Sequence, residues 1–367
     1  MKCREEIMRK RIYLMRPSVG TEEIKEIRKV IHSKFLTEGK VTQQFEKTVA
    51  RYTHTKYAIA TTSATTALHT MFHCMKVKEK NVLVSDFTFP ATVLAIIQAG
   101  GKPILVDVDK DSMNVTREII ESALNPSIEF VAPVSLFGNP LSVDFYNLRK
   151  QGVKIIEDGA TNLGTKVNNK FVGSLADVTC FSFHPRKIIT TGEGGMITTN
   201  NKKLEGKIRS FKIFGKKGSE FVDIGTNYKL SDIHSAIGLS QMRKIEKIIK
   251  KRIHQAKIYN ELLSRIDFIE PQRQTQKSRH TYQSYTCIVS KQGLRDKIMK
   301  KLSLKNIESQ IGTYALHCLP AFKKTPKIGS LGNSEFLYKN TISLPLHNEL
   351  SQNEQEVICK IIKKNLN

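Results

Sequence analysis

The sequence lacks several features that would set it apart from ordinary globular proteins. No apolar run approaches the roughly 20 residues that a membrane-spanning helix needs, and the basic N-terminal segment has no uninterrupted apolar core. The cysteines lie far apart, with no Cys-x-x-Cys pair that would indicate a metal site or a disulfide scaffold. They are Cys3, Cys74, Cys180, Cys287, Cys318 and Cys359. We therefore expect a cytoplasmic protein with reduced thiols, no bound metal and no membrane association.

Acidic residues are also scarce relative to basic ones. The chain has 34 acidic and 59 basic residues, which gives a formal net charge of +25. Such an excess attracts anions of many kinds, from nucleic acids to nucleotide diphosphates. The basic residues are densest from Lys244 to Arg252, where helical spacing indicates a solvated face. Because no RNA-binding or DNA-binding signature accompanies the charge, we expect no nucleic-acid partner.

The length and the order of apolar runs indicate the fold class. A chain of 367 residues with 40% apolar residues suits a large domain and a smaller one. Seven short β-branched runs alternate with several helix-length stretches, which predicts an α/β fold with a mostly parallel seven-stranded sheet between helices. The seven runs begin at Tyr57, Val82, Ile104, Phe130, Val153, Val178 and Met196.

The pattern changes near residue 240. A long Lys-rich amphipathic helix is predicted from there to about Arg265, and a strand-like run begins at Tyr285. We expect residues 1–239 to form the large domain and residues 240–367 to form a smaller α+β domain.

Polar residues follow two of the predicted strands, at the edge of the sheet where α/β proteins bind ligands. Asp158 ends one strand, Ser182 ends another, and Lys187 lies just beyond Ser182 in the stretch FSFHPRKIITTGEGGM. A lysine that forms a Schiff base must lose its proton, so it belongs in a partly desolvated pocket. By itself Lys187 would be read as a surface lysine, and only this context favours the catalytic interpretation.

Two further segments have both an ordinary and a functional interpretation. Asp158 could merely cap the turn that follows its strand, or its carboxylate could bond a pyridine nitrogen and keep that nitrogen protonated. The stretch TTSATTAL, from Thr61 to Leu68, predicts a helix that begins with hydroxyl residues. The start of this helix could hold a phosphate through its free N–H groups, although an ordinary Ser or Thr cap explains the same residues.

A series of motifs along nearly the whole chain resembles one enzyme family. The motifs are FLTEGKVTQQFE, SATTAL, DFTFPAT, LFGNP, IIEDGA, FSFHPRKIITTGEGG, GTNYKLSDIHSAIG and ISLP. They make the sequence similar to the DegT/DnrJ/EryC1/StrS aminotransferases, fold-type-I enzymes that use pyridoxal 5'-phosphate and act mostly on nucleotide-linked keto sugars. The resemblance implies this cofactor, a nucleotide-sugar substrate and an amino-acid donor, in amino-sugar or polysaccharide biosynthesis.

The resemblance also implies roles for residues around the cofactor ring. Lys187 matches the Schiff-base lysine, Asp158 matches the residue that bonds the pyridine nitrogen, and Phe89 matches the aromatic residue that stacks on the ring. From the residue alone, Phe89 would be assigned to the core.

Other positions match the residues that hold the cofactor phosphate. Ser182 matches part of this phosphate cradle, together with Ala64 and Thr65 at the helix start. Asn227 matches an asparagine that reaches the phosphate from the neighbouring subunit, so the resemblance implies a homodimer with shared active sites. From the residue alone, Asn227 would be a turn residue.

Four positions depart from the family pattern, and two histidines are further candidates for the pocket. Ala64 stands where Gly is usual, Gly159 where Ala is common, Thr161 where Gln or His often contacts the cofactor, and Lys229 where Arg usually follows Asn-Tyr. The roles of Thr161 and Lys229 stay open, as do those of His184 and His317.

The implied reaction transfers an amino group from an amino acid, with glutamate as the expected donor, to a nucleotide-linked keto sugar. Lys187 would act as the base and acid that moves the proton. One alternative is a sugar dehydratase or deoxygenase of the same fold, but those relatives usually have His in place of the lysine. A nucleic-acid-binding or regulatory protein on an inherited enzyme scaffold is a second alternative, favoured only by the charge.

Overall fold

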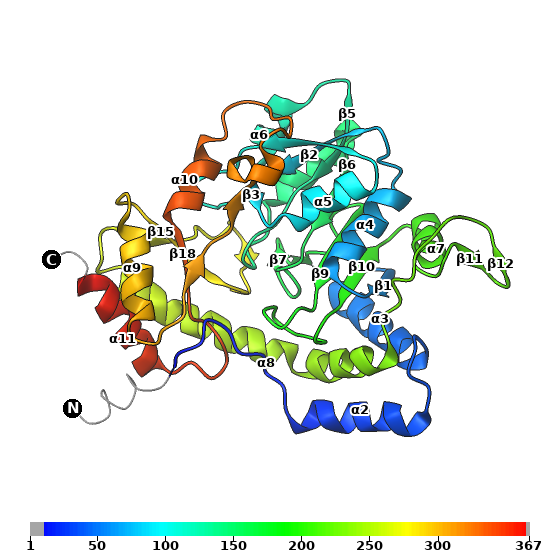
Figure 1. The fold of residues 1–367 in the computed structure, drawn as a ribbon, viewed down its shortest axis with the longest axis horizontal. Helices are drawn as coiled ribbons and strands as arrows, with labels where there is room; N and C mark the ends of the chain where they lie inside the picture. The colour runs from blue at the N-terminus through cyan, green and yellow to red at the C-terminus, as the bar shows by residue number, and fades with distance from the viewer. Residues whose placement is uncertain (1–10, 365–367) are drawn as a thin grey trace.

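A computed structural model describes residues 11–364 of the chain. Residues 1–10, which include Cys3 and most of the basic N-terminal segment, lie outside the described part. Figure 1 shows a large sheet covered by helices, with a smaller sheet beside it and the long helix α8 (Asp232–Leu263) running along both. None of the helices in residues 11–364 is long and apolar enough to span a bilayer.

The large sheet has seven strands, and each of the seven predicted strands is confirmed. The five strands from β9 to β4 run parallel, whereas β10 is antiparallel to both of its neighbours. In spatial order they are β1 (Tyr57–Thr61), β10 (Gly195–Thr199), β9 (Val178–Ser182), β6 (Lys154–Asp158), β5 (Ile128–Ala132), β2 (Asn81–Ser85) and β4 (Lys102–Val106). The predicted mostly parallel α/β sheet is therefore correct.

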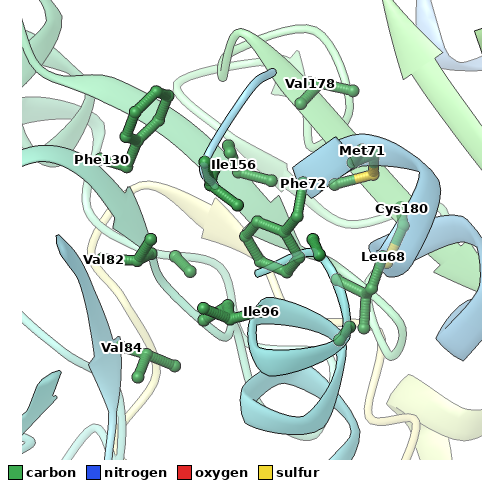
Figure 2. Packing of buried hydrophobic residues seen from close by; sticks show 14 of the residues in the cluster. Leu68, Met71, Phe72, Val82, Val84, Ile96, Phe130, Ile156, Val178 and Cys180 are labelled. Atoms are coloured by element: carbon green, nitrogen blue, oxygen red, sulfur yellow. The ribbon is translucent and has the colours of Figure 1, made fainter. Parts of the chain in front are cut away.

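Helices bury both faces of this sheet, which explains why the sequences of its strands are nearly continuous apolar runs. Leu68, Met71 and Phe72 of α4 (Ala64–Cys74) pack against side chains of the strands and against Ile96 of α5 (Ala91–Gln98) (Figure 2). On the other side, apolar residues of α3 (Lys40–Thr53) and α8 pack together with residues of β9 and β10. Helix α7 (Lys202–Phe211), α6 (Arg117–Ala123) and the 3-10 helix η1 (Val143–Gln151) complete the cover.

Helix α8 begins earlier than the sequence analysis predicted. It starts at Asp232 rather than near residue 240, because the Ser231 side chain caps it by accepting a hydrogen bond from the backbone N–H of His234 at 3.4 Å. The expected boundary between residues 239 and 240 falls inside this continuous helix. The division into 1–239 and 240–367 stays a prediction.

The C-terminal part contains an antiparallel sheet of four strands. Its order is β13 (Ile269–Pro271), β15 (Tyr285–Val289), β18 (Thr341–Leu344) and β16 (Gln310–Ile311). Helices α9 (Leu294–Ser303) and α11 (Gln352–Lys363) pack on it with the second half of α8. Ile12 from the other end of the chain belongs to the same core and pairs with Ile307.

The remaining elements are short or lie at the edges of the molecule. They are α2 (Thr21–Ser33), β3 (Phe87–Thr88), β7 (Lys166–Val167), β8 (Lys170–Phe171), β11 (Lys216–Lys217), β12 (Glu220–Phe221), β14 (Ser278–Arg279), β17 (Tyr314–Ala315), η2 (Leu316–Cys318), η3 (Pro320–Phe322) and α10 (Gly332–Asn340). The β11–β12 hairpin projects from the body of the molecule beside α7 (Figure 1).

Candidate active site

A cavity of 610 Å³ lies at the carboxyl ends of β6 and β9. Six of the seven predicted site residues line it, and they come from four separate segments of the chain: Ala64, Thr65, Phe89, Asp158, Ser182 and Lys187. Asn227 is the exception, since it is not part of the lining of this cavity in its own chain. The sheet therefore gathers in one place nearly all the residues that the sequence motifs indicated.

Lys187 lies in the loop that joins β9 to β10. Both ends of this loop are fixed, because Ser182 and Gly195 are paired in the sheet. The backbone N–H of Lys187 donates to the carbonyl of His184 at 2.9 Å, which closes a turn at the lysine. Burial lowers the pKa of Lys187, although the nearby Asp158 carboxylate acts in the opposite direction. A larger share of the amine is therefore neutral than in an exposed lysine, as nucleophilic attack requires.

The same loop is attached to the C-terminal part of the chain. The Gln283 side chain donates to the carbonyl of Arg186 at 2.7 Å, and the Arg186 guanidinium donates to Gln310 at 2.8 Å. Gln283 and Gln310 also line the cavity. The sequence analysis did not identify these two residues, because no local pattern shows that they meet the lysine loop.

Asp158 is held at both oxygens of its carboxylate. Oδ2 accepts a hydrogen bond from the Thr92 hydroxyl at 2.7 Å, and Oδ1 accepts one from the backbone N–H of Ala160 at 3.0 Å. The Cys180 thiol lies 3.7 Å from Oδ1. Asp158 is 6% exposed and lines the cavity, so its carboxylate can meet a ligand there. Thr92 was also missed, although it belongs to the DFTFPAT motif.

The N-terminus of α4 forms another wall of the cavity. The Ser63 side chain caps the helix by accepting a hydrogen bond from the backbone N–H of Thr66 at 3.1 Å. Ala64 and Thr65 follow, and the first N–H groups of a helix have no acceptor within it. They can bind an anionic group.

Gly195 permits this wall to approach β10 closely. A Cβ atom at Gly195 would lie 2.3 Å from the carbonyl oxygen of Ser63 and 2.8 Å from the backbone nitrogen of Ala64. Both are backbone atoms that cannot move aside like a side chain. The α4 terminus and the lysine loop therefore share a boundary that only a residue without a side chain allows.

Phe89 and Ser182 complete the set of predicted residues at the cavity. Phe89 is 63% exposed although it lines the cavity, and its ring centroid is 6.4 Å from that of Tyr314. It is not a core residue, which agrees with a surface that receives a flat ligand. The Ser182 side chain is buried, and its Oγ accepts a hydrogen bond from the backbone N–H of His184 at 3.4 Å.

Of the residues whose roles were left open, His184 and Thr161 line the cavity. Burial lowers the pKa of His184, so a larger share of its imidazole is neutral near pH 7 than in an exposed histidine. The Thr161 hydroxyl donates to the carbonyl of Ser135 at 2.7 Å and is held in place by that bond. Both side chains are therefore available as parts of the cavity wall.

His317 and Lys229 do not line the cavity. The His317 ring nitrogen Nδ1 lies 2.7 Å from Oδ2 of Asp86, a fully buried carboxylate. The Lys229 ammonium lies over the ring of Phe214, 5.1 Å from its centroid. His317 and Lys229 therefore each have a contact partner in their own chain, outside the cavity.

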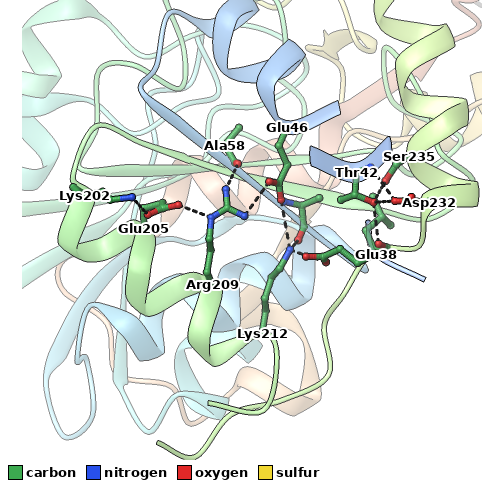
Figure 3. Close-up of polar contacts among 12 residues, drawn as sticks. Glu38, Thr42, Glu46, Ala58, Lys202, Glu205, Arg209, Lys212, Asp232 and Ser235 are labelled. Carbon is green, nitrogen blue, oxygen red and sulfur yellow. Dashed lines mark hydrogen bonds and ion pairs between the residues drawn. The ribbon is translucent and has the colours of Figure 1, made fainter. Parts of the chain in front are cut away.

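Lys212, Glu38 and Glu46 form a group of buried charges (Figure 3), and Lys212 precedes the residue with which Asn227 pairs. Asn227 pairs with Ile213, and the preceding residue Lys212 is buried, with its ammonium 2.8 Å from Glu38 and 3.5 Å from Glu46. Asp232 holds the adjoining start of α3, since one of its oxygens accepts hydrogen bonds from the backbone N–H groups of Gly39 at 2.8 Å and Thr42 at 2.9 Å. The segment that carries Asn227 is thus joined to the first turns of α3 and α8.

Comparisons with known proteins agree with this arrangement. The sequence profile of the DegT/DnrJ/EryC1/StrS aminotransferase family matches residues 17–363. A UDP-4-amino-4,6-dideoxy-N-acetyl-beta-L-altrosamine transaminase from Campylobacter jejuni is 30% identical over 359 residues, which cover 93% of this chain and 94% of the relative. The solved structure of Helicobacter pylori PseC, an aminotransferase involved in the biosynthesis of pseudoaminic acid, has a TM-score of 0.91 at 26% identity and covers 97% of this chain and 99% of PseC.

A dehydratase has a similar structure. The Escherichia coli GDP-4-keto-6-deoxy-D-mannose-3-dehydratase, solved with bound hydrated PLP, has a TM-score of 0.90 and covers 96% of this chain and 99% of that enzyme. Its identity is 22%, so this likeness shows the fold alone. The choice between the two reactions therefore depends on the residues in the cavity.

Proposed function

Because the chain belongs to the DegT/DnrJ/EryC1/StrS aminotransferase family, we propose that it transfers an amino group from an amino acid to a nucleotide-linked keto sugar. Glutamate is the expected donor. The observation that carries this proposal is the buried Lys187 in the same cavity as the Asp158 carboxylate. The Campylobacter jejuni transaminase, which is named for a UDP-linked amino sugar, supports the substrate class.

The residues of the cavity fit pyridoxal 5'-phosphate, the cofactor of this family. Lys187 would hold its aldehyde carbon, Asp158 its ring nitrogen, and the α4 terminus with Ser182 its phosphate, while Phe89 would face the ring. The bound cofactor supplies an electron sink for the carbon that exchanges its amino group. Lys187 Nζ would act as base and then as acid, moving a proton between the donor carbon and the cofactor carbon, and its lowered pKa favours the neutral amine that the base step needs. Asp158 would keep the ring nitrogen protonated.

The alternative function is dehydration or deoxygenation of a sugar on the same fold. Relatives with that activity usually have His at the position of the lysine, and this chain has Lys187. The lysine therefore favours transamination.

We also propose that two copies of the chain share their active sites, with Asn227 of one copy reaching the cavity of the other. Asn227 lies outside its own cavity, and several large apolar side chains nearby in the sequence are exposed. Phe214, Phe221 and Ile224 are 47%, 70% and 85% exposed, a concentration that is typical of protein contact surfaces. A two-fold axis would repeat each contact and complete both cavities.

The five cysteines in the described residues are free thiols, which supports the further proposal that the enzyme works in the cytoplasm.

The first test replaces Lys187. Lys187→Ala should abolish turnover of glutamate with a panel of nucleotide-linked keto sugars, measured by product mass, because the proton-transferring amine is lost. The matched control is Lys150→Ala, which removes an exposed lysine that does not line the cavity and should keep wild-type turnover. Near-normal turnover of Lys187→Ala would overturn the proposal.

The second test concerns the shared sites. Lys187→Ala and Asn227→Ala should each impair both sites of a homodimer, but a mixed dimer contains one intact site. Unfolding and refolding the two variants together makes about half of the dimers mixed, so roughly a quarter of all sites should recover under this symmetry. If each variant alone is defective and mixing gives no gain, Asn227 does not serve the partner's site.

A further inference from the structure

Thr92 is a fully buried hydroxyl beside the cavity, and the chemistry proposed above does not yet use it. It lies in the first turn of α5, where a threonine commonly bonds to a backbone group close to it in sequence. Its hydroxyl instead donates to Oδ2 of Asp158 at 2.7 Å, the one hydrogen bond of this side chain within residues 11–364. An ionised carboxylate can only accept, so Thr92 is the donor. The hydroxyl therefore joins α5 to the carboxylate at the end of β6.

The contacts of Asp158 divide between its two oxygens. Oδ1 meets the backbone N–H of Ala160 and the Cys180 thiol, which belong to the following turn and to the neighbouring strand β9. Oδ2 is held by Thr92. A carboxylate held at one oxygen can rotate about its Cβ–Cγ bond, whereas one held at both oxygens has a fixed plane. Thr92 is thus the residue that fixes this plane.

The segment that carries Thr92 also carries Phe89. This segment is anchored at its beginning by Asp86, whose carboxylate accepts a hydrogen bond from the backbone N–H of His317 at 2.9 Å and lies 2.7 Å from Nδ1 of the same histidine. It is anchored at its end by the bond between Thr92 and Asp158. Phe89 lies between the two anchors, three residues before Thr92 and outside the helix. Phe89, which would face a flat ligand, and Thr92, which holds the Asp158 carboxylate, therefore belong to one segment.

We infer that Thr92 is a positioning residue that fixes the plane of the Asp158 carboxylate toward the ring nitrogen of bound pyridoxal 5'-phosphate. This inference rests on the function proposed above for Asp158. Without the hydroxyl, the carboxylate keeps only the donors at Oδ1 and can turn away from the ring. The contact with the ring nitrogen then weakens, and the cofactor binds less tightly. Loss of a hydrogen bond to a charged group corresponds to a roughly tenfold to hundredfold effect.

The test compares Thr92→Val, which keeps the shape of the side chain without its hydroxyl, with Thr92→Ser, which keeps the hydroxyl. The dissociation constant of pyridoxal 5'-phosphate from the full-length apoprotein should rise at least about tenfold in Thr92→Val and stay near wild type in Thr92→Ser. The pH at which the absorbance of the bound cofactor changes should also shift in Thr92→Val only. In turnover assays, kcat should fall in the valine variant while KM for the sugar is unchanged.

A cofactor analogue separates positioning from a general structural effect. In 1-deazapyridoxal phosphate a carbon replaces the ring nitrogen, so the contact with Asp158 is absent. Wild type and Thr92→Val should therefore bind the analogue equally well. The control variant Thr53→Val removes another buried threonine hydroxyl, which donates to the carbonyl of Val49 within α3 at 2.9 Å. It should not change the affinity for either compound.

Two results would overturn the inference. One is wild-type cofactor affinity and pH behaviour in Thr92→Val, and the other is an equal loss of affinity for the cofactor and the deaza analogue. Thr92→Ala removes the same hydroxyl and provides the same measurements if the valine variant does not fold. A failure of the proposed function is recognised separately, because Asp158→Ala would then retain both cofactor affinity and turnover. If Asp158→Ala loses both while Thr92→Val matches wild type, only the role of Thr92 is rejected.

Discussion

The raised pKa of the buried Glu157 carboxyl, next to Asp158 in the sequence, provides a test of how burial affects charge in this sheet. Glu157 precedes Asp158 on β6, so its side chain points to the opposite face of the sheet, and it is fully buried. Its Oε1 accepts hydrogen bonds from the Ser135 hydroxyl at 2.6 Å and the Tyr146 hydroxyl at 3.1 Å. Burial raises the pKa of Glu157 to about 7, and the negative charge of Asp158 adds to the rise. The folded protein therefore favours the protonated carboxyl.

The size of the effect follows from this pKa. The ordinary value is 4.5, so the two pKa values differ by about 2.5, and at about 1.4 kcal/mol for each pH unit this corresponds to about 3.5 kcal/mol. Because the pKa is raised in the folded state, the stabilisation is complete below pH 4.5 and is lost as the pH rises to 7. Glutamine has nearly the same shape and does not titrate. The Glu157→Gln variant should therefore lack this part of the pH dependence.

The assay is urea unfolding of wild type and Glu157→Gln at a series of pH values from 4.5 to 8. The free energy of unfolding of wild type minus that of the variant should fall by about 3 kcal/mol across this range. The exposed Glu261 on α8 supplies the control, because Glu261→Gln changes the same chemical group at the surface. A wild-type-minus-variant difference that is constant with pH, or that rises toward alkaline pH, would refute the reasoning about Glu157.

Three further predictions concern other buried groups. Because burial lowers the pKa of Lys187, the apoprotein should react with pyridoxal 5'-phosphate at lower pH than free lysine does. The rate of appearance of visible absorbance against pH measures this, and a profile matching free lysine would contradict it. Lys212→Ala leaves Glu38 without its ion-pair partner, while Glu46 keeps Arg209, and should cost about 3 kcal/mol in urea unfolding, so a loss below about 1 kcal/mol would show that the pairing contributes little. Phe72→Ala should cost about 3–5 kcal/mol by opening a cavity under α4, and an unchanged urea midpoint would contradict the packing in Figure 2.

The large sheet could be predicted because its strands are buried on both faces. Runs such as those at Val82 and Val153 are apolar throughout, and the helices between them are long enough to be distinguished. The start of α8 was placed too late because the dense lysines of its middle were a stronger signal than the cap at Ser231. A single serine does not distinguish a helix start from a turn until its hydrogen bond is known.

Site residues that belong to a local sequence motif could be predicted. Site residues that reach the cavity only through tertiary contacts could not. Lys187 and Asp158 were identified from their own segments, and the structure places both at one cavity. Gln283 and Gln310 reach the lysine loop from the C-terminal part, and nothing in their local sequence indicates that contact. The position of Asn227 relative to a second copy depends on an association between chains, so its role stays a prediction.

The place of β10 in the sheet has a consequence for how the enzyme matures. Strand β10 lies between β1 and β9, and Tyr57 on β1 pairs with Thr199 on β10, far along the chain. The α4 terminus follows β1 and the lysine loop precedes β10, so the cavity does not exist until these distant strands meet. Pairing of strands that are so far apart in the sequence is slow, because a long loop must be closed first. The α4 terminus and the lysine loop can therefore form one cavity only after β10 has entered the sheet, and Gln283 and Gln310 complete its wall from segments that follow still later in the chain.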